Sequence, residues 1–217
     1  MYLRTKVIAS LTLLAAAFMS SQAAVAQGAA AAGDAKRGHD LSYTCNGCHA
    51  ITNYKNVYPT YSVPKLHNQR PEYLVAALKA YKSGDRSHGT MHSQAVTMSE
   101  KDMADIAAYL AGPSVITESK NDPAAKDAPK AAATCVACHG TNGVGITADF
   151  PTLAGQHADY IERALLDYQK GGRKNAVMGG IVATLTREDI EALANYYSTR
   201  TPALETVPKR NFFFSAK

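Results

Sequence analysis

Two five-residue stretches constrain this chain more than any other feature, namely Cys45-Asn46-Gly47-Cys48-His49 and Cys135-Val136-Ala137-Cys138-His139. Each reads C-x-x-C-H, the attachment pattern of a c-type haem. Two thiols at this spacing can form thioethers with the two vinyl groups at one edge of a porphyrin, and the following histidine can then reach the iron as proximal ligand. The motifs use all four cysteines of the chain. We therefore predict two covalent haems c, attached through Cys45, Cys48, Cys135 and Cys138 and ligated by His49 and His139.

Two other roles of paired cysteines are the alternatives. Structural zinc sites use C-x-x-C pairs, but the two pairs usually lie closer in sequence, and zinc gives no reason for a histidine after each pair. Disulfides suit an oxidising compartment, yet a disulfide between cysteines two residues apart is usually a redox motif. It leaves the trailing histidines unexplained as well, so haem is the favoured interpretation.

The first 26 residues have the pattern of a secretory signal peptide. Arg4 and Lys6 precede an apolar run from Val7 to about Met19, and an A-x-A cleavage site ends at Ala26. The run is short for a membrane span, although an uncleaved anchor is an alternative. We predict cleavage near Ala26 and a periplasmic protein, with peripheral membrane association as a further option. Loss of the two basic residues lowers the formal net charge from +5 to +3, and no block of like charge indicates a nucleic-acid partner.

The second half of the chain repeats the first. The haem motifs lie 90 residues apart, whereas positions downstream of them match at a shift of 87, so the tyrosine-rich loop after His49 is three residues longer than its counterpart. The matched pairs include Pro64/Pro151, Gln69/Gln156, Tyr73/Tyr160, Tyr81/Tyr168, Arg86/Arg173 and Met91/Met178. We predict a signal peptide at 1–26, domains at 34–112 and 128–200, a linker at 113–127 and a C-terminal tail at 201–217.

Helical patterns recur in both halves, and no stretch alternates convincingly like a strand. Pro71 is expected to begin one helix, and Ser99 and Thr186 have the sequence context of helix N-caps. The predicted helices cover 34–44, 71–81 and 99–110, and then 127–134, 157–168 and 186–198. The predicted fold class is all-α, in two similar domains.

The sixth ligand of each iron decides whether the site is closed, as in an electron carrier, or open to gases and substrates. Met178 is the only methionine after Met103 and falls in a predicted loop at 174–180. The 87-residue shift then selects Met91, because Met98 and Met103 match the core-like Leu185 and Ile190. An alternative for the first site is bis-histidine ligation through His88 or His92, which flank Met91 but have no histidine counterparts in the second half.

Four further residues are candidate contacts of the haems. Arg86 and Arg173 can pair with haem propionates, or they are solvated loop charges. Pro64 and Pro151 can supply a carbonyl that accepts the ring N–H of the proximal histidine and so fixes its tautomer, or they are plain turn residues. The sequence assigns no role to the Phe212-Phe213-Phe214 tail.

Taken together, these motifs resemble the dihaem cytochrome c4 family, which is built from two tandem class I cytochrome c domains. The resemblance covers about 34–112 and 128–200. The second half carries the fuller pattern, in Phe150 to Gln156, Gly171-Gly172-Arg173 and Met178. The first half departs from it, with His67-Asn68-Gln69 in place of Ala-Gly-Gln. The resemblance implies two domains that face each other across a pseudo-twofold axis, with their propionate edges close together.

The function that the resemblance implies is one-electron transport between respiratory-chain donors and a terminal oxidase or reductase. Partners would be a membrane quinol-oxidising complex, the oxidase, or a periplasmic dehydrogenase. A second reading makes the chain the electron-accepting cytochrome subunit of such a dehydrogenase, of the flavocytochrome type. A third, a dihaem peroxidase, requires an open or displaceable sixth site, and the matched Met91 and Met178 argue against it.

Overall fold

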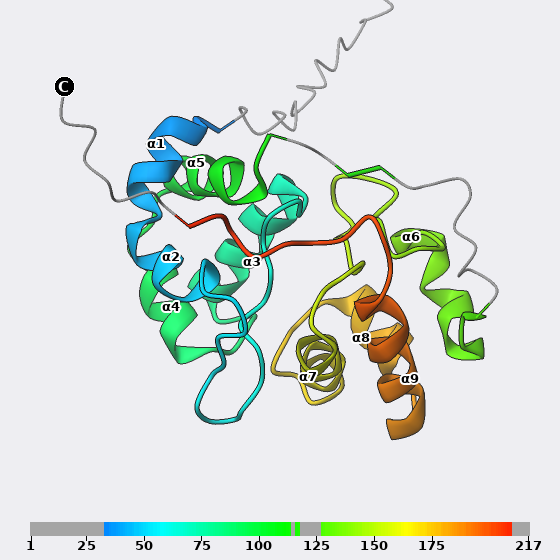
Figure 1. Cartoon of the computed structure of the whole chain (residues 1–217). Helices are drawn as coiled ribbons and strands as arrows, with labels where there is room; N and C mark the ends of the chain where they lie inside the picture. Colours follow the sequence, from blue (N-terminus) through cyan, green and yellow to red (C-terminus); the bar gives the residue numbers. More distant parts are fainter. Residues whose placement is uncertain (1–32, 114–115, 118–126, 210–217) are drawn as a thin grey trace, which may run out of the picture.

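The computed structural model describes residues 33–113, 116–117 and 127–209 (Figure 1). The predicted signal peptide, most of the predicted linker and the Phe212–Phe214 tail lie outside these residues. Within the described ranges the regular structure is helical, and β-pairing is limited to isolated bridges. The all-α prediction is confirmed. Figure 1 shows two helical bodies, the first half in blue to green and the second in yellow-green to orange.

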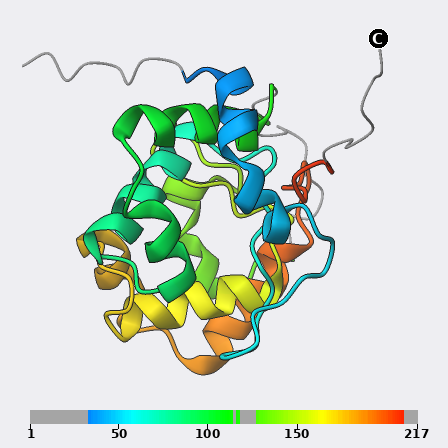
Figure 2. The ribbon, with the colours of Figure 1, turned by 90° about the vertical axis from the view of Figure 1, so that its left-hand side faces the viewer.

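Five α-helices lie within residues 33–113. They are α1 (Ala35–Leu41), α2 (Tyr43–His49), α3 (Pro71–Ser83), α4 (Gly89–Ala95) and α5 (Glu100–Ala111). The predicted helix at 34–44 is broken at Ser42, so the haem motif lies on its own helix, α2. Helices α1 and α5 pack side by side (Figure 2). Gly38 permits this approach, because a Cβ there would lie 1.8 Å from the Asp105 carbonyl oxygen.

Packing of α1 on α5 buries the carboxylate of Asp105, whose side chain is 1% exposed. It accepts hydrogen bonds from the backbone N–H of Asp34 at 2.8 Å and from Lys101 at 2.8 Å, and it pairs with Arg37. Lys101 and Arg37 together lower the pKa of the Asp105 carboxyl, through hydrogen bonds first and charge second. The buried charge is therefore paired and hydrogen-bonded, as a buried carboxylate requires.

The second half repeats this pattern with shorter leading elements. It contains η2 (Lys130–Thr134), α6 (Val136–His139), α7 (Ala158–Gln169), α8 (Ala176–Val182) and α9 (Arg187–Ser198). The predicted helix at 127–134 is instead a 3₁₀ segment, because Pro129 precedes it and only five residues separate that proline from Cys135. Capping boxes begin α5 at Ser99 and α9 at Thr186, as predicted.

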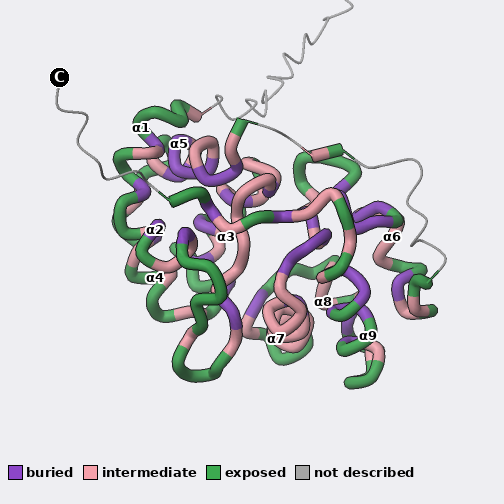
Figure 3. Tube along the Cα trace, viewed as in Figure 1, coloured by how far each residue is buried: buried purple, intermediate pink, exposed green. Residues whose placement is uncertain are grey.

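Each half has its own hydrophobic core, and α5 and α9 carry many of the buried residues (Figure 3). The first core cluster centres on Leu74, Leu78, Met103, Ile106 and Leu110, and the second on Ile161, Leu193, Ala194, Tyr196 and Tyr197. Met103 is 1% exposed, which agrees with its predicted core position.

The predicted loop at 174–180 is wrong in one respect. Residues 176–182 form the short helix α8, and the equivalent residues of the first half form α4. The helix starts because the Asn175 side chain accepts the backbone N–H of Met178, which satisfies an otherwise unpaired donor of the first turn. Met178 and Met91 therefore lie on ordered helical turns.

The C-terminal segment returns from the second half to the first, as the red trace in Figure 1 shows. Its backbone pairs with Ala154 of the second half through Leu204, and then with His67 through Glu205. The Val207 N–H donates to the His49 carbonyl at 3.1 Å, and the Val207 side chain is buried in the first core. Residues 201–209, predicted only as a tail, form a strap between the two halves.

Candidate functional site

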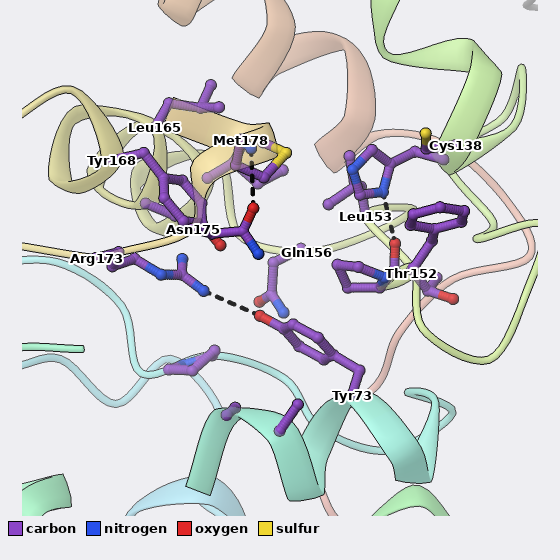
Figure 4. Close-up of a pocket in the computed structure, with 18 of the residues that line it drawn as sticks. Tyr73, Cys138, Thr152, Leu153, Gln156, Leu165, Tyr168, Arg173, Asn175 and Met178 are labelled. Atoms are coloured by element: carbon purple, nitrogen blue, oxygen red, sulfur yellow. Dashed lines mark hydrogen bonds between the residues drawn. The ribbon is translucent and has the colours of Figure 1, made fainter. Parts of the chain in front are cut away.

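A cavity of about 380 Å³ lies beside the second C-x-x-C-H motif and reaches the first half of the chain (Figure 4). This volume is typical of a site for a small molecule or cofactor. Its lining includes Cys135, Cys138, His139 and Met178 from the second half, and Tyr73 and Arg86 from the first. The structure thus brings the predicted attachment and ligand residues of the second site together around one space.

Both motif histidines are oriented by a proline carbonyl. The Nδ1 atom of His139 lies 2.9 Å from the Pro151 carbonyl oxygen, and Nδ1 of His49 lies 2.9 Å from that of Pro64. The carbonyl can only accept, so Nδ1 carries the proton and Nε2 keeps its lone pair. Burial lowers the pKa of both imidazoles, although each carbonyl opposes that shift. Each ring is thereby held neutral, and the carbonyl contact that was one of the two expectations for Pro64 and Pro151 is present.

The two candidate methionines occupy equivalent helical turns. The backbone N–H of Met178 donates to Asn175 Oδ1 at 2.9 Å, as Figure 4 shows, and that of Met91 donates to His88 Nδ1 at 3.3 Å. Met91 packs against the first core cluster. Thr44 on α2 donates to Gln94 on α4 at 2.8 Å, so the helix that carries Met91 lies beside the motif helix.

The histidines that flank Met91 are engaged elsewhere. His88 uses Nδ1 to cap α4, and its Nε2 lies 3.2 Å from Asn56 Oδ1. The Nδ1 atom of His92 lies 2.8 Å from the carbonyl oxygen of Tyr81, and the residue is exposed. Neither ring nitrogen of His88 is left for an iron, which argues against bis-histidine ligation through His88.

Arg86 and Arg173 lie at the boundary between the halves, and each is 8% exposed. Their backbones form an antiparallel bridge. Arg173 donates to the hydroxyl of Tyr73 at 3.0 Å, and Arg86 donates to that of Tyr160. Because both side chains are buried, the reading as solvated loop charges is wrong. Neither guanidinium has a carboxylate partner among the described residues.

Each arginine also stacks on a tyrosine of its own half. The guanidinium carbon of Arg86 lies 4.4 Å from the ring centroid of Tyr81, and that of Arg173 lies 4.6 Å from that of Tyr168. Burial alone would raise the pKa of Tyr73, but Arg173 and Arg86 outweigh it and lower the value to about 8. Two buried positive charges without a negative partner make this boundary strongly attractive to an anion.

Two glutamines complete a symmetric contact that the sequence did not predict. Gln69 donates to the Thr152 carbonyl at 2.9 Å and accepts from its N–H at 2.8 Å. Gln156 makes the same pair of bonds with Lys65, at 2.9 and 3.0 Å. Because Lys65 and Gln69 are related to Thr152 and Gln156 by 87 residues, the two halves meet across a pseudo-twofold axis. The repeat matches Gln69 with Gln156 in the sequence, but such a match alone does not indicate that either residue lies at a domain interface.

The cysteine side chains are not joined in disulfides. Burial raises the pKa of the Cys45 and Cys135 thiols, so neither is a reactive thiolate at neutral pH. Among the described residues, no group of three or more His, Cys, Asp or Glu side chains has the geometry of a metal site. None of the described helices is both long and apolar enough to cross a bilayer.

Comparison with known proteins gives consistent results. The sequence matches the cytochrome c family over residues 35–112 and again over 125–200. Cytochrome c4 of Pseudomonas aeruginosa is 34% identical over 180 residues, which cover 76% of this chain and 88% of that protein. The thiosulfate dehydrogenase electron acceptor of Stutzerimonas stutzeri strain A1501 is 29% identical over 195 residues, which cover 83% and 88% of the two chains. The crystal structure of reduced recombinant cytochrome c4 from Pseudomonas stutzeri superposes with a TM-score of 0.64 at 32% identity, covering 78% of this chain and all of that one.

Proposed function

The chain belongs to the dihaem cytochrome c4 branch of the cytochrome c family, and we propose that it carries single electrons in the periplasm between respiratory-chain donors and a terminal oxidase or reductase. It is an electron-transfer protein with two haems c and not an enzyme. The periplasmic location rests on the signal-peptide pattern that ends near Ala26. The domain limits 34–112 and 128–200, with a linker at 113–127, belong to the same proposal.

The proposed attachment residues are Cys45 and Cys48 for the first haem and Cys135 and Cys138 for the second. His49 and His139 are the proposed proximal ligands, because their Nδ1 atoms are held by carbonyls and their Nε2 atoms keep a lone pair. Met91 and Met178 are the proposed sixth ligands, supported by their equivalent places on α4 and α8.

The donor set fits a haem in three respects. Neutral imidazole and thioether are the usual axial pair of electron-transfer haems. The cavity next to Cys135 and Cys138 has a mostly apolar lining that includes Leu153 and Ile161. Arg86 and Arg173 are buried cations without a carboxylate partner among the described residues, and a haem carries two propionates that supply the missing negative charge.

When bound, each haem supplies a one-electron Fe(III)/Fe(II) couple. The chain contributes the positioning of the proposed ligands. Pro64 and Pro151 fix the tautomer and orientation of the proximal histidines, and His88 and Asn175 fix the turns that carry the methionines. His49 with Met91 and His139 with Met178 would hold the two irons through anchored side chains, so little rearrangement would accompany electron transfer.

The observation that carries the proposal is the pseudo-twofold boundary formed by Arg86, Arg173, Tyr73 and Tyr160. It places the proposed propionate contacts of both domains beside one another, so the two haems would face each other at short range. The test is reoxidation of the chemically reduced protein by membranes that contain a terminal oxidase. We expect both haems to be reoxidised, and oxidation that stops after one haem would contradict a two-haem conductor.

A second candidate function is electron acceptance from a dedicated dehydrogenase. It is supported by the 29% identity to a protein described as a thiosulfate dehydrogenase electron acceptor. Reduction of the oxidised protein by a purified thiosulfate dehydrogenase and thiosulfate, compared with reduction by quinol-oxidising membranes, separates the two candidates.

A further inference from the structure

The helices that carry Met91 and Met178 begin with different residues. The N-cap of helix α8 is Asn175, whose short side chain accepts the Met178 N–H. Helix α4 starts at the equivalent His88, whose Nδ1 accepts the Met91 N–H. A neutral imidazole that accepts through one nitrogen carries its proton on the other. The His88 ring therefore supplies an additional donor at the cap of the first domain, whereas the Asn175 amide Nδ2 of the second domain donates to no described residue.

That additional donor bonds to a hairpin formed by residues 54–63. Nε2 of His88 lies 3.2 Å from Asn56 Oδ1. The hairpin holds the amide in place, because the N–H and the Nδ2 of Asn56 both donate to the Tyr61 carbonyl, at 2.9 and 3.3 Å. An antiparallel bridge between Lys55 and Ser62 closes it. With its amide nitrogen occupied, Asn56 presents its oxygen to His88.

The hairpin is in turn attached to the second domain. The N–H and the hydroxyl of Ser62 donate to Asp159 Oδ2 on α7, at 3.0 and 2.9 Å. Lys55 lies 3.5 Å from the same carboxylate. The repeat positions of Ser62 and Asp159 are Asp149 and Glu72, and no equivalent contact joins them among the described residues. The link from α7 of the second domain to Met91 of the first therefore has no counterpart from α3 to Met178 among the described residues.

We propose that Asn56 and His88 are a positioning pair for Met91, so that the hairpin controls how firmly the first haem keeps its methionine. The inference rests on the proposed ligation by Met91. In the described part of the second domain, Asn175 is the cap of the corresponding turn, with no second residue attached to it. The two haems then differ in the ease of methionine displacement, and a change in the hairpin affects the first haem only.

The test is a titration of the oxidised, full-length holoprotein with imidazole, which competes with methionine for ferric haem. The readout is loss of the methionine–Fe(III) charge-transfer band. Asn56→Ala is expected to raise the imidazole affinity of one haem about fivefold, the effect of one lost neutral hydrogen bond. Asn175→Ala is expected to raise that of the other haem by a similar or larger factor. Tyr58→Ala, at a hairpin residue that is 95% exposed, should change neither.

A double substitution separates positioning from general loosening of the hairpin. His88→Asn gives the first domain the cap of the second, which needs no partner at position 56. We expect Asn56→Ala to have no further effect on imidazole affinity in the His88→Asn background. An equal effect in both backgrounds, or none in either, would overturn the proposal. A different result, in which Met91→Ala keeps the whole charge-transfer band, would instead refute the ligand assignment itself.

Discussion

The guanidinium of Arg173 in the second domain donates a hydrogen bond to the hydroxyl of Tyr73 in the first, with 3.0 Å between Nη2 and Oη. Its repeat counterpart, Arg86, donates to Tyr160 in the opposite direction. Each domain thus supplies the acceptor that holds the other domain's arginine. The two proposed propionate contacts are consequently positioned by the interface together with the tyrosine of their own domain on which each guanidinium stacks.

Removal of the Tyr73 hydroxyl should weaken this interface. Tyr73→Phe leaves a buried guanidinium short of one acceptor, which is expected to cost about 1–3 kcal/mol of unfolding free energy. Tyr160→Phe should cost a similar amount because of the pseudo-twofold symmetry. Denaturant unfolding of the holoprotein measures both. The control is Tyr58→Phe, whose side chain is 95% exposed and which should stay within about 0.5 kcal/mol of wild type. Equal stability of the Tyr73 and Tyr58 variants would contradict the role of the crossed pairs.

Acid should weaken the contact between α1 and α5. The pKa of Asp105 is lower in the folded protein than in the unfolded chain, because Lys101, Arg37 and the Asp34 N–H all favour the ionised form. Its stabilising contribution is therefore complete above about pH 4 and is lost as the pH falls through the folded-state value. Asp105→Asn should lower stability at pH 7, and the difference from wild type should shrink at pH 3.

Urea unfolding at both pH values checks the acid prediction. Asp127→Asn, at an exposed carboxylate, is the matched control and should behave like wild type at each pH. A difference between Asp105→Asn and wild type that is the same at pH 7 and pH 3 would show that the charge of Asp105 is not what stabilises the helix pair.

The strap at 201–209 should stabilise the first domain although it follows the second in sequence. Val207 is 2% exposed within the first core cluster, so Val207→Ala removes two buried methyl-sized groups and should cost about 2 kcal/mol. Glu205→Ala, an exposed position whose backbone pairing with His67 remains, is the control. Hydrogen exchange of α5 amides locates the effect, and loss of protection confined to the second domain would contradict it.

The fold class, the repeat and the core helices could be predicted because the sequence itself carries their signals, namely the two motifs, the 87-residue shift and the caps at Ser99 and Thr186. The helices α4 and α8 were missed, although Asn175 stands three residues before Met178 in a capping arrangement. Gly179 and Gly180 favoured a loop assignment for this segment, because glycine disfavours helix interiors.

The contacts between domains could not be predicted from local pattern. Gln69 pairs with Thr152 and Tyr73 with Arg173 only once the relative orientation of the domains is known. The strap was missed for a similar reason. Leu204 and Val207 are too few apolar positions to indicate an element, and their burial depends on surfaces that other segments provide.

Closure of both haems by Met91 and Met178 can be measured in the absorption of the oxidised protein, in the methionine–Fe(III) charge-transfer region. The wild type should show two low-spin haems that contribute about equally to the band. Met91→Ala should remove one contribution, Met178→Ala the other, and the double substitution all of it. A high-spin haem in the untreated wild type, or a full band in either single variant, would contradict the account.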